Sequence, residues 1–351
     1  MKTALLIDEC INDLNNQIAF FEKNKSGFLS LGETWSERAN KISNQIRDDK
    51  SILINFKKSN IFNSDIPAGN MGKFKKFIFD MFSALPTFIK FHPYINYIED
   101  GFKVIKEENA IETLKKNIMS SIGNPICYKK KKYNLTYRWL RHILLLSYFE
   151  KKLSKVEDID IVADIGTGYG TFPMLLKKNF KSKKFILIDF PEQLCAAKYY
   201  IKSEFPDAKI TSFEDIKDQE FLNRDFFKKY DFSFVPCFLI DKIQENSADI
   251  FCNFASLNEM PRVWFNKYLQ SKLFKSSKYL YTMNRFTRMP MDKNEKEPIS
   301  ILDMPLRDYK KIFFDVFKLY KWSYIPFKIL NYPIYSRKVW HDPLYVFIGK
   351  K

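Results

Sequence analysis

The sequence predicts an α/β protein in which a doubly wound parallel sheet follows a mainly helical N-terminal region. Three observations lead to this prediction. From Ile161 onward, short apolar segments alternate with helical patterns, which is typical of strands joined by crossover helices. A glycine-rich turn follows the first apolar segment directly. Residues 1–130 have helical patterns and no such turn, so we expect a helical region at 1–130 and a sheet domain at 131–351.

The N-terminal region contains three segments with a helical pattern. Residues 3–25 place their apolar side chains on one helical face, and residues 33–58 and 107–119 are two further candidate helices. Proline and glycine residues at 67–72 predict a loop. The segment 73–91 is basic and rich in phenylalanine, which is typical of a core helix with a lysine face. The alternative for this segment is peripheral docking on a membrane surface.

A basic segment links the two regions. The lysine run at 129–132 predicts a solvated loop, with contact to a phosphate-bearing acceptor as the alternative. Asn134 is expected to cap the helix that follows. Arg138, Arg141 and His142 lie on that helix shortly before the first strand, so they are candidates to face a cofactor.

The second region contains the predicted sheet. Its strands are expected at 161–165, 185–189, 232–236, 250–255 and 279–284. Crossover helices are expected at 172–179, 192–203, 239–245 and 263–271. Two further strands, at 322–327 and 344–349, are expected to form a closing hairpin.

The turn after the first strand reads Asp-x-Gly-x-Gly-x-Gly at 164–170. Glycine allows positive φ and a close approach of backbone to a ligand. A nicotinamide fingerprint would place its third glycine one residue later, at Thr171, and would not require an acid at Asp164. A carboxylate there suits an ammonium group, such as that of S-adenosylmethionine (SAM). The pattern therefore favours SAM over a dinucleotide, with a turn that binds no ligand as the remaining alternative.

A second acid supports this interpretation. Asp189 ends the next apolar strand, about 20 residues after the turn, where doubly wound folds place the carboxylate that binds both ribose hydroxyls. Asp189 could instead cap the helix that begins near Pro191, and one residue can serve both purposes.

The composition is that of a folded protein. The chain has 351 residues, of which 46% are hydrophobic and 17% aromatic. Its net charge of +17 suggests a polyanionic partner, but lysine outnumbers arginine, the better residue for bidentate phosphate recognition, so no specific nucleic acid is expected. Five scattered cysteines and three histidines fit a reducing compartment and no metal site. No segment resembles a membrane span or a signal peptide, so we expect a cytoplasmic protein.

Several blocks of the sequence resemble the sugar O-methyltransferases of bacterial surface-polysaccharide clusters, which belong to the class I SAM-dependent methyltransferases. The resemblance covers residues 134–351. Asp-Phe-Pro at 189–191 looks like the family's Asp-Leu-Pro or Asp-Ile-Pro, and Ser-Leu-Asn-Glu-Met at 256–260 looks like its Ser-x-x-Glu-Met. The remaining blocks lie at 163–170, 199–200, 234–236, 248–255 and 281–285. The resemblance implies a Rossmann-like sheet, SAM as cofactor and a carbohydrate acceptor.

The resemblance also assigns roles to individual residues. Asp164 and the turn residues Gly166, Thr167 and Gly168 would hold the methionine end of SAM. Asp189 would bind the ribose, and the adenine would lie near the residues that follow the second and third strands, Phe190, Pro236 and Cys237. Asn253, which ends the fourth strand, would lie beside the sulfonium and the acceptor.

The predicted reaction needs a base, because a sugar hydroxyl is a poor nucleophile until it loses its proton. Glu259 is the first candidate, since it follows the fourth strand; its alternative is a structural role at a helix N-terminus. His341 is the second candidate, with an ordinary loop histidine as its alternative, and His142 is the third. We expect a metal-free reaction.

Other residues and roles follow less directly. Asn258 and Asn284 are candidates to orient the hydroxyl, and Arg262 and Arg285 are candidates to hold an acidic sugar or a phosphate. The alternatives for the whole chain are an RNA methyltransferase and a non-catalytic module that keeps the SAM fold. An RNA methyltransferase that modifies amino groups would tend to have an Asn/Asp-Pro-Pro-Tyr/Phe motif after the fourth strand. This chain has Asn-Phe-Ala-Ser at 253–256 instead, which argues against that alternative. The helical N-terminal region would cover the acceptor cleft or form a homodimer interface.

Overall fold

The computed structural model describes residues 2–25, 33–58, 93–130, 132–154, 156, 158–288, 296–320, 322–329, 332–340 and 343–351. The chain forms two compact units, each made of segments that are distant in sequence. The first contains Met1–Leu53, Ser154–Val316 and Leu344–Lys351, and the second contains Ile54–Leu153 and Phe317–Pro343. The functional division at residue 130 stays a prediction.

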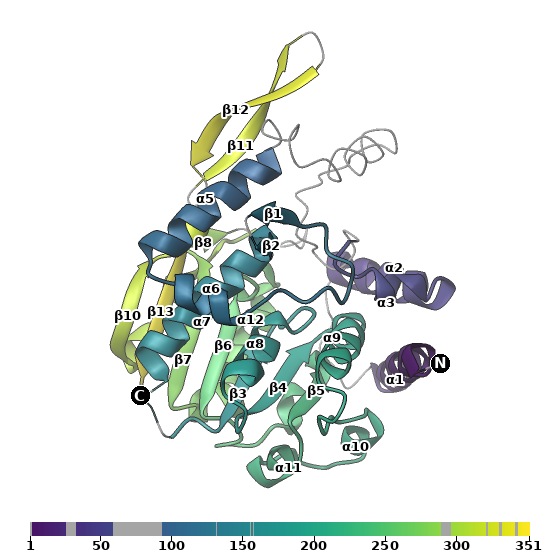
Figure 1. The fold of residues 1–351 in the computed structure, drawn as a ribbon. Coiled ribbons are helices and arrows are strands. Elements are labelled where there is room, and N and C mark those ends of the chain that lie inside the picture. The colour runs from purple at the N-terminus through teal and green to yellow at the C-terminus, as the bar shows by residue number, and fades with distance from the viewer. Residues whose placement is uncertain are drawn as a thin grey trace. The chain divides into compact units, whose positions relative to one another are not determined.

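The first unit contains a seven-stranded sheet with the order β10-β13-β7-β6-β3-β4-β5 (Figure 1). Its strands are β3 (Ile161–Ile165), β4 (Lys184–Asp189), β5 (Phe232–Pro236), β6 (Ile250–Phe254), β7 (Tyr279–Arg285), β10 (Lys310–Val316) and β13 (Leu344–Lys350). The five neighbouring strands β7, β6, β3, β4 and β5 are parallel. The strand β13 runs antiparallel to both β7 and β10. This arrangement confirms the predicted α/β fold with a doubly wound, Rossmann-like sheet.

The strand order of the sheet marks a candidate position for a ligand. The order of connection reverses between β3 and its neighbour β6, because the chain first moves outward to β4 and β5 and then returns. In open sheets of this kind, ligands bind outside the carboxyl ends of the strands at such a point. The residues of β3, β5 and β6 are all buried, so these strands are mostly apolar in the sequence, each with one polar residue.

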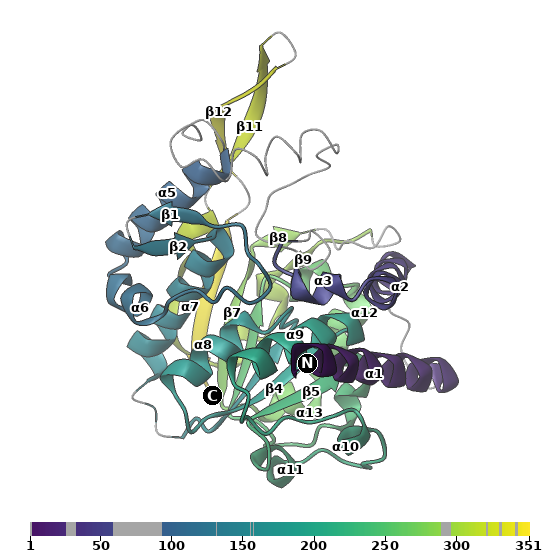
Figure 2. The same cartoon turned by 45° about the vertical axis from the view of Figure 1, so that its right-hand side comes forward.

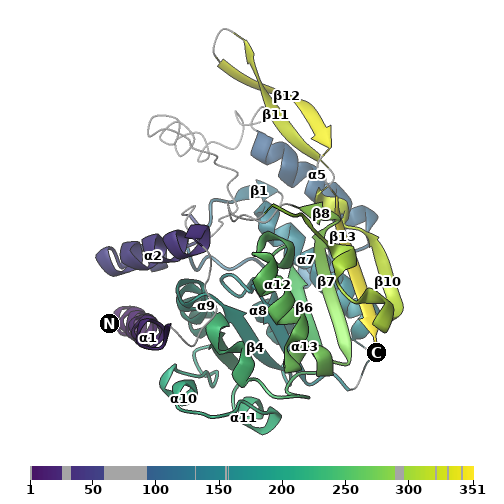
Figure 3. The ribbon, with the colours of Figure 1, turned by 180° about the vertical axis from the view of Figure 1, so that it is seen from behind.

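Helices cover both faces of this sheet. The helix α8 (Thr171–Asn179) lies over one face, and α12 (Arg262–Gln270) and α13 (Lys272–Ser276) lie over the other, as Figure 3 shows from behind. Three further helices are α9 (Pro191–Glu204), α10 (Glu214–Lys217) and α11 (Arg224–Lys228). The crossover predicted at 239–245 is the 3-10 helix η4 (Cys237–Lys242).

The N-terminal helix α1 (Lys2–Lys23) belongs to the first unit and lies beside α9 (Figures 1 and 2). The predicted helix at 33–58 is divided into α2 (Glu33–Asp48) and α3 (Ser51–Ile54). The division follows from Asp49, whose side-chain oxygen accepts the backbone N–H of Ser51 at 2.9 Å and so replaces a helical hydrogen bond.

The second unit contains helices and two small hairpins. Its elements are α5 (Pro93–Glu107), α6 (Ile111–Lys116), β1 (Tyr128–Lys130), β2 (Tyr133–Leu135), α7 (Tyr137–Leu153), η8 (Lys318–Tyr320), β11 (Trp322–Ile329) and β12 (Tyr332–Trp340). The lysine run is therefore partly a strand, since β1 pairs with β2. The expected cap at Asn134 is wrong, because this residue pairs with Lys129 in the hairpin. Thr136 caps α7 instead, and its hydroxyl accepts the N–H of Trp139 at 3.1 Å.

The predicted closing hairpin is also wrong. The strand β11 pairs with β12, and β13 enters the main sheet between β7 and β10. Proline explains why β12 was missed, because Pro333 lies within it and such residues argue against a strand. The edge strand β10 was missed because its side chains are mostly exposed and show no clear alternation.

Three predictions concern residues outside this description: the loop at 67–72, the segment 73–91 and His341. Among the helices of the described residues, none has both the length and the apolar character needed to cross a membrane.

Candidate functional site

The turn after β3 has the backbone conformation that its glycines predict. Gly166, Gly168 and Gly170 have φ values of +67°, +57° and +75°. A Cβ atom at Gly166 would lie 2.1 Å from Oγ of Ser256, so the turn packs closely on the loop after β6. A Cβ atom at Gly168 would meet no other atom within 4 Å. The backbone at Gly168 therefore borders open space into which a ligand can fit.

Asp189 connects this turn to the end of β4. Its Oδ2 accepts the backbone N–H of Gly168 at 2.7 Å, and its Oδ1 accepts the N–H of Phe190 at 2.8 Å. Burial raises the pKa of this carboxyl to about 6, although both hydrogen bonds and the charge of Arg38 act in the opposite direction. Near neutral pH the group is thus a carboxylate with further lone pairs for hydroxyl donors.

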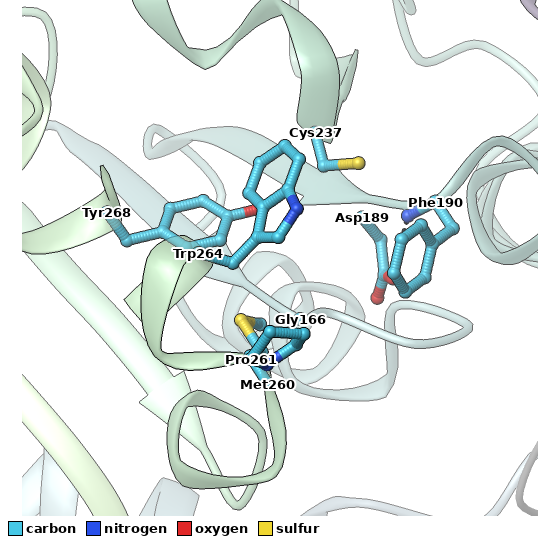
Figure 4. Close-up of a pocket in the computed structure, with 8 residues that line it drawn as sticks. All are labelled: Gly166, Asp189, Phe190, Cys237, Met260, Pro261, Trp264 and Tyr268. Carbon is cyan, nitrogen blue, oxygen red and sulfur yellow. Dashed lines mark hydrogen bonds between the residues drawn. The ribbon is translucent and has the colours of Figure 1, made fainter. Parts of the chain in front are cut away.

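A partly open pocket lies at the carboxyl ends of β3, β4 and β5, and its empty space, open solvent included, is about 340 Å³ (Figure 4). Its lining residues come from the ends of these strands and the turns after them, from α12 and from the two residues before α12: Gly166, Asp189, Phe190, Cys237, Met260, Pro261, Trp264 and Tyr268. Phe190 and Asp189 lie across the cavity from Trp264. The rings of Trp264 and Tyr268 pack against each other with centroids 5.8 Å apart. An aromatic wall with one carboxylate suits a flat heterocycle joined to a hydroxyl-bearing group.

Asp164 lies buried beneath the glycine turn. Only 3% of its surface is exposed, and its Oδ2 accepts the hydroxyl of Thr167 at 2.8 Å. Two of the residues predicted to hold the methionine end of SAM are therefore hydrogen-bonded to each other. This hydrogen bond joins the last part of β3 to the glycine turn and so stabilises the conformation of the turn.

Asn253 ties together the loops at the crevice. Its Nδ2 donates to the carbonyl of Ile165 at 2.8 Å and to Oγ of Ser256 at 2.6 Å. Its Oδ1 accepts from the N–H of Leu257 and from Nδ2 of Asn284, at 3.2 and 3.0 Å. The side chain of Asn253 is fully buried. Through these hydrogen bonds its amide connects the ends of β3, β6 and β7.

Pro236 and Ala255 also lie at the ends of these strands. Pro236, the last residue of β5, is buried and lies opposite Asp189 in the parallel register. Ala255 follows β6 with φ +59°, a conformation that is strained for a residue with a Cβ atom. Strained backbone of this kind often occurs at functional sites.

Glu259 ends the 3-10 helix η5 (Leu257–Glu259), directly before the cavity residues Met260 and Pro261. Its Oε1 lies 3.2 Å from Nη1 of Arg288 in β8 (Thr287–Arg288), and both side chains are about one-quarter exposed. Glu259 thus lies after the fourth strand and beside the cavity, and its role as base stays a prediction. The guanidinium holds the carboxylate next to the cavity rather than inside it.

The other candidates have different surroundings. His142 is buried on α7 of the second unit, its Nδ1 lies 2.8 Å from the carbonyl of Arg138, and burial lowers its pKa well below the usual value. Arg262 binds the carbonyl of Pro298 and the carboxylate of Asp303 at 2.7 and 3.3 Å. Within the part of the chain that the structure describes, no group of three or more His, Cys, Asp and Glu side chains is placed to hold a metal ion.

Sequence reasoning missed several residues of this site. Trp264 and Tyr268 are four residues apart on α12, and this spacing could have identified an aromatic face directed at the crevice. Glu192 is 98% buried beside Asp189, and its Oε2 has no hydrogen-bond partner among the described residues. Burial and, to a smaller extent, the charge of Asp189 raise the pKa of Glu192 to about 8. No pattern in the sequence indicates this burial, because a glutamate in a first helical turn is usually solvated.

No protein-family model matches the chain, and no curated protein matches it. Among solved structures, it is similar to the PH0226 protein from Pyrococcus horikoshii, with 10% identity and a TM-score of 0.37 over 61% of this chain and 91% of the other. It is also similar to the methyltransferase domain of bacterial CtHen1, with 10% identity and a TM-score of 0.35 over 60% and 97%. A third similar structure is precorrin-6y C5,15-methyltransferase from Geobacter metallireducens, with 13% identity and a TM-score of 0.30 over 64% and 93%. Similarity at this level identifies neither a family nor an acceptor.

Proposed function

We propose that the chain is a SAM-dependent O-methyltransferase that acts on a sugar hydroxyl of a surface glycan or of its nucleotide-linked precursor. The observation that carries the proposal is the link between Gly168 and Asp189. An open glycine turn and a carboxylate with free lone pairs meet at the carboxyl ends of β3 and β4, and β3 is one of the two strands between which the strand order reverses.

The residues of the crevice fit the parts of SAM. Asp189 offers acceptors for the two ribose hydroxyls, and the aromatic cavity next to it suits the adenine, with Phe190 and Cys237 in its wall. The open space at Gly168 lets the backbone approach the chain that joins ribose to methionine. Asp164 and Thr167, beneath the turn, are proposed to favour the ammonium group.

SAM supplies an electrophilic methyl group on a sulfonium. The protein must hold the acceptor oxygen in line with that methyl group, and such positioning can contribute roughly 7–11 kcal/mol to lowering the barrier. The loop from Asn253 to Ser256 is proposed to border the acceptor, because its hydrogen bonds and the strained Ala255 fix its conformation.

Glu259 is the proposed base for the acceptor hydroxyl. Its carboxylate lies at the carboxyl end of β6, adjacent in sequence to two residues of the cavity wall. Arg288 keeps it oriented, and a carboxylate that accepts the proton as the C–O bond forms would contribute about 10²–10⁴-fold. His341 remains the second candidate.

The choice of a sugar rests on the resemblance of 189–191 and 256–260 to the sugar O-methyltransferases. The structure places both blocks at the same crevice, since Asp189, Phe190 and Met260 line one cavity. A homodimer and a cytoplasmic location are further parts of the proposal.

Two measurements test this function. Calorimetry with S-adenosylhomocysteine (SAH) should show binding to the wild type, and Asp189→Ala should weaken it. Labelled methyl groups from SAM should then appear on sugar nucleotides or extracted surface glycans, and not on RNA from the same cells. A wild-type protein that binds no SAH would contradict the proposal, and transfer to RNA alone would replace the sugar by RNA as the acceptor.

A further inference from the structure

The helix α1 is fixed to the sheet unit by buried charges. Lys198 of α9 is 99% buried, and its ammonium lies 3.4 Å from Glu9 and 3.5 Å from Asp13 of α1. Asp13 also accepts the backbone N–H of Phe213 at 2.6 Å. A buried ammonium is tolerated only when it is paired, so removal of α1 would leave this charge without its partners. We therefore treat α1 as an integral part of the unit.

The C-terminal half of α1 packs against η4. The ring centroid of Phe21 lies 5.1 Å from that of Phe238, and Phe20 lies 6.4 Å from the same ring. Phe20 also packs edge-on against Phe213, with a centroid distance of 5.4 Å. Phe20 and Phe21 thus extend the apolar cluster that contains Cys237, Phe238, Trp264 and Tyr268.

One short segment connects α1 with the cavity. Cys237 and Phe238 are consecutive residues at the start of η4, directly after β5. Cys237 lines the cavity, and Phe238 contacts α1. A 3-10 helix has poorer hydrogen-bond geometry than an α-helix, so its position depends strongly on what packs against it. The aromatic rings of α1 therefore support the segment that carries Cys237.

We infer that α1 positions the adenine end of the donor cavity, with Phe21 as the positioning residue that acts through Phe238 on Cys237. This inference rests on the proposed function, because it takes the cavity as the site of SAM. It gives part of the N-terminal region a role in donor binding, whereas the sequence suggested an acceptor cover or a dimer interface. The helix would not touch the donor itself.

The test compares two phenylalanine-to-alanine variants that lose similar packing in different places. Phe21→Ala removes the ring behind Phe238. Phe205→Ala removes a ring that stacks on Phe232 at 5.7 Å, at the opposite end of β5 from Cys237. Phe21→Leu keeps most of the volume and serves as a milder variant if Phe21→Ala folds poorly. For each protein, thermal unfolding and the Kd values of SAH and adenosine are measured at one pH.

We expect Phe21→Ala to weaken the binding of SAH and adenosine by the same factor, about threefold to tenfold, since an aromatic pair of this kind is lost. Adenosine must be affected as strongly as SAH, because the disturbed wall lies at the adenine end. Phe205→Ala should lower Tm and leave both Kd values unchanged. Phe21→Leu should fall between the wild type and Phe21→Ala.

Two outcomes overturn the inference in different ways. If the wild type binds SAH and neither Phe21 variant changes either Kd, α1 has no role in the cavity, while the proposed function stands. If Phe205→Ala weakens adenosine as much as Phe21→Ala does, the effect reflects general destabilisation and the positioning role is wrong. If the wild type binds neither ligand, the proposed function and the inference fail together.

Discussion

The backbone N–H of Gly168 donates to Oδ2 of Asp189 over 2.7 Å, so the turn after β3 and the end of β4 form one connected structure. The same carboxylate accepts the N–H of Phe190 through its other oxygen. Asp189 therefore shapes the turn as well as the cavity wall. A substitution at the end of β3 or of β4 will affect both the turn and the cavity wall. Two variants must therefore be compared to separate an effect on folding from an effect on binding.

Gly166 and Gly168 should respond differently to alanine. Gly166→Ala places a Cβ atom 2.1 Å from Oγ of Ser256 at φ +67°, so we expect a loss of stability greater than about 2 kcal/mol. Gly168→Ala has only the backbone strain, about 1–2 kcal/mol, because its Cβ atom meets nothing within 4 Å. That Cβ atom would occupy the space proposed for the donor, so SAH affinity should fall at least about tenfold. Thermal unfolding and calorimetry on both variants measure the two effects separately.

Each of these two glycine variants serves as the control for the other. If Gly168→Ala binds SAH as the wild type does, the donor does not pass this turn. If Gly166→Ala is as stable as the wild type, the close approach of the two loops is wrong.

The binding of SAH should depend on pH through Asp189. The pKa of this group is raised to about 6 by burial, so the carboxylate that accepts hydroxyl protons is lost as pH falls through 6. Affinity should be constant at higher pH and decrease below pH 6 by up to about tenfold per pH unit. Arg38→Gln removes a charge that lowers this pKa, so the midpoint should move to higher pH. Calorimetric titrations between pH 5 and 8 check both expectations.

Asp189→Asn provides the comparison for this pH profile. It cannot titrate, so its SAH affinity should be weaker than that of the wild type near neutral pH and nearly flat below it. A wild-type profile without a transition near pH 6 would falsify the assignment of Asp189 to the donor.

Much of the sheet could be predicted from the sequence because its central strands are buried on both faces. The runs at 161–165 and 232–236 agree with β3 and β5 at both ends. The entry of β13 between β7 and β10 could not be predicted, since it depends on which distant edge the last strand pairs with. Apolar runs determine that a strand exists, whereas its partner depends on contacts between segments far apart in the chain.

The candidate site shows the same division. Asp189 was predictable because its position after the second strand has a general meaning in doubly wound folds. The hydrogen bonds of Asn253 and the ion pair of Glu259 with Arg288 join segments that are distant in sequence. No local sequence pattern could therefore predict them. Trp264 and Tyr268 were missed because two aromatic residues on a helix are more often part of a core.

Glu192 should make the free energy of unfolding depend on pH, and the substitution Glu192→Gln should remove this dependence. Burial raises its folded-state pKa from 4.5 to about 8, so the folded protein binds this proton more tightly than the unfolded chain. The contribution of Glu192 is most favourable at low pH and is lost as pH rises from about 4.5 through 8. Glu192→Gln should therefore raise Tm more at pH 8.5 than at pH 5.5, by roughly 3–6 °C.

The measurement is thermal unfolding of both proteins across this pH range. Asp189 contributes in the same direction at lower pH in both proteins, so the difference between them isolates Glu192. Equal Tm differences at pH 5.5 and pH 8.5 would show that Glu192 does not change its protonation in this range.

Glu259→Gln separates catalysis from donor binding. The side chain lies beside the cavity and is held by Arg288, so an isosteric amide should leave the fold and the Kd of SAH unchanged. If Glu259 accepts the proton of the acceptor hydroxyl, kcat should fall about 10²–10⁴-fold. His341→Ala, prepared in parallel, tests the second candidate, and a loss of kcat in that variant alone moves the role of base to His341. Full kcat in both variants means that neither residue removes the proton, whereas a loss of SAH binding in Glu259→Gln would place this carboxylate in the donor site instead.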